Sequence, residues 1–211
     1  MQLISQSFKD GEKIPGEFAF AVVDPVSHVA LSSNRNPHMA WSQVPEGTQS
    51  FVVVCHDPDV PSRGDDVNQA DREVPASLPR VDFFHWLLLD VPSTTTEIEA
   101  GAHAEGVTPR GKAGPAALND WRHGINDYTG WFANDEQMKG EYYGYDGPCP
   151  PWNDAIVHRY IFTVYALATP SLEIKGPLTG ASVRAALASA PVLGQASLTG
   201  LYSLNPKVQS N

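Results

Sequence analysis

Two aspartates in a proline-rich segment directly follow one of the most apolar stretches of the chain. The segment is His56-Asp57-Pro58-Asp59-Val60-Pro61. Each proline fixes its own φ angle and favours an extended backbone at the residue before it. Because side chains two apart in an extended chain point to the same side, we expect Asp57 and Asp59 to present a pair of carboxylates. An ordinary turn is the alternative, since Asp and Pro are common at strand ends.

A histidine interrupts a second apolar stretch, Phe-Phe-His-Trp-Leu-Leu-Leu, at position 85. A polar ring in a buried strand must find a hydrogen-bond partner or face a cavity that holds solvent or ligand. Strict alternation places His85 on the same face as Leu87 and Leu89, and it places Trp86 on the opposite face. Taken singly, such a residue is more often a satisfied core histidine than a ligand-binding one.

A further histidine opens the segment His158-Arg159-Tyr160-Ile161-Phe162. By alternation His158 shares a face with Tyr160 and Phe162, whereas Arg159 points the other way. Here too, a core role is the alternative to ligand binding.

The segment that precedes His158 is too rich in Gly and Pro for regular structure. It is Gly144-Tyr145-Asp146-Gly147-Pro148-Cys149-Pro150-Pro151. Loops of this kind expose backbone N–H groups that can bind an anion. Cys149 has no recognisable catalytic signature around it, so we expect a thiol without a catalytic role.

Short apolar runs separated by 18 prolines and 17 glycines predict strands as the elements that position these residues. The runs richest in β-branched and aromatic residues are Ser50–His56, Phe83–Val91 and Val157–Ala168, with weaker candidates at Leu3–Phe8, Glu17–Val23 and Ser197–Leu204. A helix is predicted at Ser182–Ala190, capped by Thr179 or Ser182. The stretches Pro58–Arg80 and Pro92–Tyr143 are expected to be long loops.

Composition narrows the class of protein. The formal net charge is −10 without a cluster of Lys or Arg, so nucleic acids and anionic membrane surfaces are poor partners. No apolar run reaches membrane-spanning length and the N-terminus lacks the pattern of a signal peptide, so we expect a soluble, cytoplasmic protein of one domain, 1–211. Cys55 and Cys149 lie in different contexts, and we expect two unpaired thiols.

The order of these elements is more specific than any one of them. An apolar strand leads into Asp-Pro-Asp-x-Pro, and His-Trp, Gly-Tyr-x-Gly-Pro-Cys-Pro-Pro and His-Arg-Tyr-x-Phe follow. This series resembles the phosphatidylethanolamine-binding protein family, also called Raf kinase inhibitor-like, in its bacterial branch. The resemblance implies a mainly β fold, a single domain of packed antiparallel sheets with long loops and one or two short helices.

The resemblance also implies a small pocket for phosphorylated ligands or lipid headgroups. Carried over by motif position, the implied ligand-binding residues are Asp57, Asp59, His85, Tyr145, Gly147, Pro148 and His158. The residue types favour a zwitterionic headgroup, with its ammonium near a carboxylate and its phosphate near histidine, tyrosine and loop N–H groups. If the histidines titrate near neutrality, binding tightens as the pH falls toward about 6.

A binding or regulatory protein without cofactor or metal is the function expected from this resemblance, and two alternatives stay open. The Asp and His residues can in principle hold a divalent metal for phosphoester hydrolysis. The segment 129–143, which the compact bacterial members lack, contains Trp131 and Phe132. These aromatic residues can instead contact a protein partner. The alternatives are then a regulator of a kinase or protease, or a homodimer. Both rings can equally cover the protein's own core.

Overall fold

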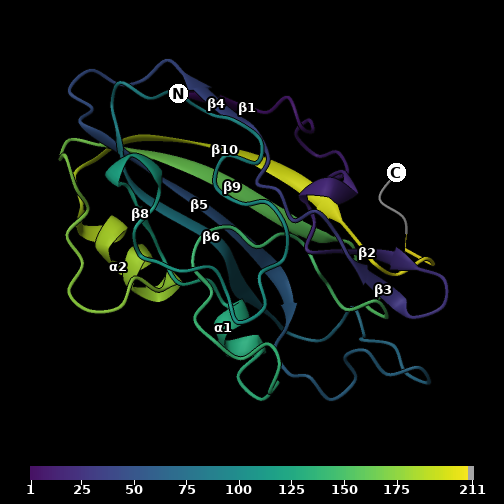
Figure 1. The fold of residues 1–211 in the computed structure, drawn as a ribbon. Coiled ribbons are helices and arrows are strands. Elements are labelled where there is room, and N and C mark those ends of the chain that lie inside the picture. The colour runs from purple at the N-terminus through teal and green to yellow at the C-terminus, as the bar shows by residue number, and fades with distance from the viewer. Residues whose placement is uncertain (209–211) are drawn as a thin grey trace.

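The protein, described here over residues 1–208 by a computed structural model, consists mainly of strands (Figure 1). The strands are β1 (Gln2–Ile4), β2 (Ala21–Asp24), β3 (His28–Leu31), β4 (Met39–Ser42), β5 (Ser50–Pro61), β6 (Arg80–Pro92), β7 (Glu97–Ile98), β8 (Arg122–His123), β9 (His158–Leu167) and β10 (Val192–Tyr202). The helices are α1 (Tyr128–Trp131) and α2 (Gly180–Ser189), with 3-10 turns at Gly16–Phe18 and Leu118–Asp120. The mainly β expectation is confirmed.

A five-stranded antiparallel sheet, in the order β10-β9-β5-β6-β8, forms the centre of the molecule. Its strands form from apolar, β-branched segments, and both faces are covered. Phe51, Val53 and Cys55 of β5 pack into the larger core on one face, together with the small β1-β4-β7 sheet. Val52 and Val54 point to the other face, where they join a smaller core with residues of α2. Strict alternation along β5 therefore holds through its apolar half.

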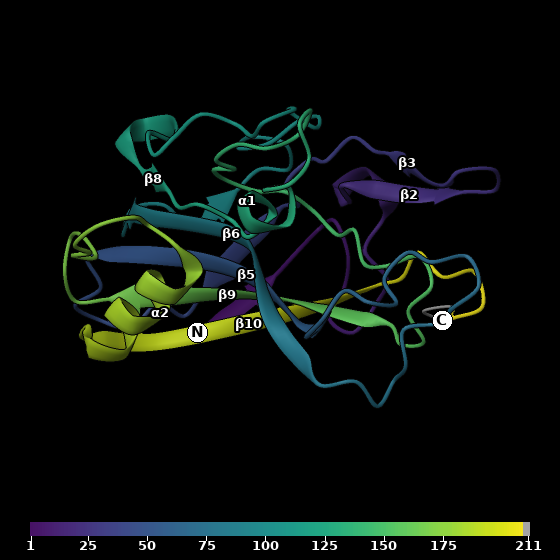
Figure 2. The ribbon, with the colours of Figure 1, turned by 90° about the horizontal axis from the view of Figure 1, so that it is seen from below.

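The two ends of the central sheet carry different structures. Helix α2 and the β2–β3 hairpin lie at opposite ends of the sheet in both views (Figures 1 and 2). Helix α2 begins with a capping box in which Thr179 accepts from the backbone N–H of Ser182, so Thr179 is the cap of the two predicted candidates. No helix within residues 1–208 has the length and apolar character needed to cross a membrane.

Several strands differ in length from the sequence expectation. Strand β5 continues through the Asp-Pro-Asp-Val-Pro segment to Pro61, so the following loop begins later than predicted. Strand β1 is shorter than predicted, and the expected strand Glu17–Val23 is divided between a 3-10 turn and the start of β2. Strand β10 begins at Val192, directly after α2, and is longer than its predicted segment. The chain segment before β2 also pairs with β10, because Ile14 donates to the backbone oxygen of Leu201.

A β-bulge at His85 changes which face the residues of β6 occupy. Cys55 of β5 pairs with Trp86, but the next residue, His56, pairs with Phe84, so His85 has no opposite partner. Consequently His85 and Trp86 both lie on the side of the larger core, whereas Leu87 lies with α2. The predicted alternation, with His85 on the face of Leu87 and opposite Trp86, is therefore wrong. An extra residue on one strand re-aims a side chain, and such bulges are frequent beside functional sites.

Candidate ligand-binding pocket

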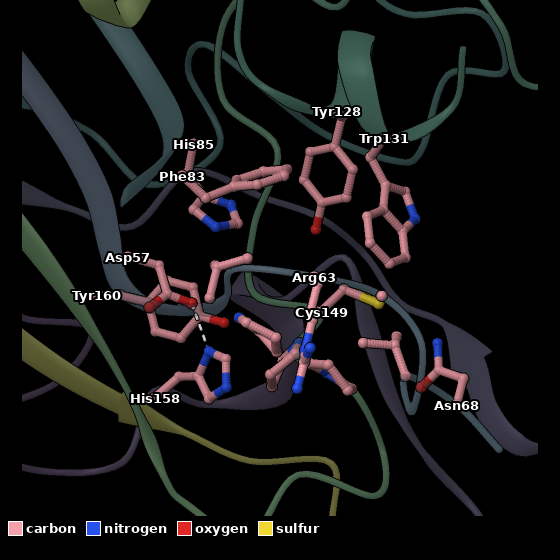
Figure 3. A pocket seen from close by; sticks show the side chains of 16 residues that line it. Asp57, Arg63, Asn68, Phe83, His85, Tyr128, Trp131, Cys149, His158 and Tyr160 are labelled. Atoms are coloured by element: carbon pink, nitrogen blue, oxygen red, sulfur yellow. Dashed lines mark hydrogen bonds and ion pairs between the residues drawn. The ribbon is translucent and has the colours of Figure 1, made fainter. Parts of the chain in front are cut away.

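A cavity of about 150 Å³ opens beside the His85 bulge, where the end of β5 meets the first halves of β6 and β9 (Figure 3). Four residues with polar groups gather at one end, and mainly apolar and aromatic side chains, together with Arg63 and Asn68, form the remaining wall and rim. The polar end contains Asp57, His85, His158 and Tyr160, and the wall and rim contain Val60, Pro61, Arg63, Gly64, Val67, Asn68, Phe83, Tyr128, Trp131, Cys149, Pro150 and Pro151. A concave site with few polar groups in an apolar wall is typical of small-molecule pockets.

A chain of buried charges lies beneath the polar end. His158 donates from Nδ1 to Asp57 Oδ2 (2.6 Å) and from Nε2 to Asp154 Oδ2 (3.0 Å). Arg80 in turn donates to both oxygens of Asp154, at 2.6 and 3.0 Å. Burial opposes the charge on His158, but the hydrogen bonds to Asp154 and Asp57 outweigh it and raise its pKa to about 9. His158 is therefore an imidazolium held between two carboxylates at neutral pH.

His85 is held in the opposite protonation state. Its Nδ1 lies 2.8 Å from the backbone oxygen of Asp146, which only accepts, so Nδ1 holds the ring proton. Burial lowers the pKa of His85 to about 4, against the opposing effect of the Asp57 charge. The ring is thus neutral at physiological pH, and its one hydrogen bond to residues 1–208 is made by Nδ1, which leaves Nε2 as an open acceptor. The expectation that both histidines titrate near pH 6 is wrong for this pair.

Two tyrosines add hydroxyl groups to the cavity. Tyr160 follows His158 on the inward face of β9, as alternation predicted, and its hydroxyl has no partner within residues 1–208. Burial raises the pKa of Tyr160 well above its ordinary value, so the group stays a hydroxyl that can donate or accept. Tyr128 of α1 donates its hydroxyl hydrogen to the backbone oxygen of Gly147 (2.7 Å) and retains acceptor capacity.

Asp59 does not face the cavity with Asp57, which corrects the predicted carboxylate pair. The pairing of β5 with β6 shifts between Asp57 and Val60, and this irregularity breaks the alternation on which the prediction depended. Asp59 instead accepts two hydrogen bonds from the Arg159 guanidinium, at 2.7 and 2.8 Å. Although burial works in the opposite direction, these bonds lower the pKa of Asp59. Asp57 therefore binds His158 and Asp59 binds the next residue, Arg159, on the opposite face of β9.

Tyr145, Gly147 and Pro148 lie behind the cavity wall and are not among the lining residues that the structure describes. Tyr145 is fully buried and donates its hydroxyl hydrogen to the backbone oxygen of Phe18 (2.6 Å). The Gly147 N–H donates to Asn34 Oδ1 (2.8 Å), and the Pro148 oxygen accepts from the backbone of Phe20. The prediction that these three residues bind the ligand directly is therefore wrong. Their contacts instead hold the loop in place.

Asp146 is the residue that fixes this loop from within. Its buried carboxylate accepts hydrogen bonds from Asn34, Asn126 and Lys112, at 2.7 to 2.8 Å. Burial raises the pKa of Asp146, and the Lys112 charge acts against that rise. Because the backbone oxygen of the same residue accepts from His85, the loop also sets the tautomer of the histidine in the pocket.

The cavity mouth combines one sulfur, one cation and one large aromatic ring. Burial raises the pKa of the Cys149 thiol to about 12, so it is not a nucleophile near neutral pH. Cys55 and Cys149 are both free thiols, which confirms that expectation. Arg63 is 69% exposed at the rim, and Trp131 is 52% exposed. Phe132, in contrast, packs against the core beside Tyr128.

Sequence reasoning missed the residues that support the pocket from behind. Asp154 lies four residues before His158, and Arg80 is the first residue of β6, yet neither belongs to the motifs that drew attention. Asp154 could have been noticed as an aspartate in the Gly- and Pro-rich segment just before the strand that begins with His158. Nothing in the sequence pattern of Arg80 indicates that it would reach Asp154.

Similarity to known proteins covers nearly the whole chain. The sequence profile described as phosphatidylethanolamine-binding protein matches residues 4–203. A UPF0098 protein of Aquifex aeolicus is 30% identical over 202 residues, which are 96% of this chain and 88% of the relative. The UPF0098 protein YbhB of Escherichia coli is 31% identical over 184 residues, which are 87% of this chain and 88% of the relative.

A solved structure agrees with these relatives. The crystal structure of Escherichia coli YbcL, described as a new member of the mammalian PEBP family, superimposes with a TM-score of 0.66 at 26% identity. The match covers 96% of this chain and 97% of YbcL. The profile match, the relatives and the shared architecture together establish that the chain belongs to the phosphatidylethanolamine-binding protein family.

Proposed function

We propose that the protein binds a small phosphorylated ligand, such as a phosphorylated headgroup, in this pocket and performs no chemistry on it. The observation that supports the proposal most directly is the polar end of the cavity. There the Asp57 charge is balanced from behind by the His158 imidazolium, while the His85 Nε2 and the Tyr160 hydroxyl remain open toward the interior. These are groups that recognise a phosphoryl group by hydrogen bonds.

The apolar wall suits the organic remainder of such a ligand. Phe83 and Tyr128 meet edge to face, with ring centroids 5.2 Å apart, and Trp131 continues the aromatic surface toward the mouth. In this arrangement an ammonium is not needed at Asp57, because His158 already supplies the cation. A ligand ammonium would instead lie near the aromatic rings, which attract cations.

The same contacts favour binding over hydrolysis. Both ring nitrogens of His158 donate to carboxylates, so neither has a lone pair to offer a metal. The Cys149 thiol stays protonated because burial raises its pKa to about 12. His158 is thus removed as a metal ligand and Cys149 as a nucleophile for phosphoester hydrolysis.

Calorimetric titration with O-phosphoethanolamine and with inorganic phosphate at pH 6 tests the proposal. Replacing His85 with Ala removes one charge-assisted hydrogen bond and should weaken both ligands at least about tenfold. Asp59→Ala is the matched control, since it removes a carboxylate two residues from Asp57 that faces away from the cavity. Equal affinities in the parent and in the His85 variant would remove the pocket from this function.

A further inference from the structure

We propose that the pocket selects phosphoryl groups that carry one proton, and that it discriminates against fully ionised phosphate and against sulfate. This inference depends on the function proposed above and specifies its ligand further. It follows from a property shared by two polar groups at the closed end of the cavity: each presents a hydrogen-bond acceptor to the ligand. A phosphoryl group can form a hydrogen bond with either of them only by donating its own hydrogen.

The first acceptor is His85 Nε2. The backbone oxygen of Asp146 requires the proton on Nδ1, which leaves a lone pair on Nε2 facing the cavity. The Asp146 carbonyl cannot change this role, because the Asp146 side chain is fixed by Asn34, Asn126 and Lys112. His85 therefore accepts a hydrogen bond from the ligand and does not donate one.

The second acceptor is the Asp57 carboxylate. Its Oδ2 accepts from His158 Nδ1 (2.6 Å) and its Oδ1 accepts from the backbone N–H of Asp59 (2.7 Å). Each oxygen has a second lone pair, and a carboxylate with both oxygens engaged as acceptors has no hydrogen to give. A phosphate dianion would set its own lone pairs against those of Asp57 and His85. A monoanion, which has one P–OH group, converts one of these contacts into a hydrogen bond.

Donors are present for the remaining phosphoryl oxygens. The Tyr160 hydroxyl has no partner within residues 1–208, and the same holds for the backbone N–H groups of Gly64 and Cys149 in the cavity lining. Arg63 adds a cation at the rim, where its Nε lies 3.5 Å from Asp65 Oδ2. Donors and acceptors together match the hydrogen monoanion of a phosphate ester, whereas a sulfate ester has acceptors alone near neutral pH.

The two histidines of the site keep their protonation state between pH 5 and 8. His158 faces Asp57 and Asp154, Asp154 faces Arg80, and Asp59 faces Arg159 from the outer side. The pKa of His85 lies at about 4 and that of His158 at about 9, on either side of this range. Burial raises the pKa values of Tyr128, Tyr160 and Cys149, which moves these groups further from it. The ligand is thus the group expected to titrate.

Calorimetry from pH 5 to 8 with two phosphate monoesters of different second pKa tests this inference. A second pKa of about 6 predicts that affinity falls about 30-fold between pH 5 and 7.5. The midpoint should move with the second pKa of the ester. O-sulfoethanolamine, the isosteric control, should bind weakly at every pH. His85→Gln introduces a side-chain N–H and should flatten the profile, because the amide can turn its donor toward a dianion.

Each outcome has a distinct meaning. A midpoint that stays fixed when the ester changes would assign the titration to a protein group and overturn the inference, while phosphate binding itself would stand. Sulfate affinity equal to that of the phosphate ester would also overturn it. Absence of phosphate binding at any pH would instead refute the proposed function. Ethanolamine alone binding as tightly as O-phosphoethanolamine would place an ammonium at the two acceptors and contradict both.

Discussion

His158 should stabilise the fold at neutral pH and lose that effect in mild alkali. Its pKa rises from the ordinary value of 6.5 to about 9, a difference worth roughly 3 kcal/mol. Because the folded-state pKa lies above the unfolded one, the stabilisation is fully present below pH 6.5 and disappears as the pH rises through 9. Between pH 6 and 8.5 the loss amounts to about 2 kcal/mol.

Urea unfolding of the parent protein and of His158→Gln, at pH 6, 7 and 8.5, measures this contribution. Groups that titrate alike in both proteins, among them His85, His123 and the two thiols, contribute equally to both unfolding free energies. Their contributions therefore cancel in the difference. We expect the difference to shrink by about 2 kcal/mol between pH 6 and 8.5. The ring resonances of His158, followed by NMR in the parent, should show a midpoint near 9. A free-energy difference independent of pH would refute the assignment of His158 as a buried imidazolium.

Three further substitutions test the packing around the site. Gly147→Ala places a Cβ 2.2 Å from the backbone oxygen of Phe18, so the loop must move; thermal unfolding should show a lower Tm, and calorimetry a weaker affinity for inorganic phosphate. Thr179→Ala removes the cap of α2 and should cost about 1 kcal/mol in urea unfolding while phosphate affinity is unchanged. Leu88→Ala empties a fully buried position and should cost about 2 to 5 kcal/mol; a loss below about 1 kcal/mol would contradict the described core.

The sequence was sufficient to predict the three middle strands of the central sheet but not its irregularities. Strands β7 and β8 and helix α1 lie in the segment Pro92–Tyr143, which was predicted as a loop. Runs of β-branched and aromatic residues identified β5, β6 and β9, because such runs have few alternatives to a buried strand. The bulge at His85 could not be predicted, since it depends on how β6 pairs with β5 and leaves no trace in either segment alone. One extra residue was enough to place His85 on the same face as Trp86, where alternation had placed the two on opposite faces.

The same strand irregularities explain why the candidate site was predicted only in part. His158 and Tyr160 face inward as alternation requires, because β9 pairs regularly with β10 at that point. Asp59 was placed on the wrong side, since β5 is irregular between Asp57 and Val60. The protonation states of the two histidines could not be predicted from the sequence. They depend on hydrogen bonds to Asp146 and Asp154, which form only in the folded chain.

The chain of charges that runs from Arg80 through Asp154 and His158 to Asp57 has a consequence for how such a sequence can diverge. Each member is nearly or fully buried, and loss of any one leaves an uncompensated charge, a cost of about 3 to 5 kcal/mol for a buried ion pair. That is a large part of the 5 to 15 kcal/mol by which a typical domain is stable. Replacing the four residues one at a time is therefore expected to give proteins that fold poorly, whereas replacing them together need not leave a buried charge without its partner.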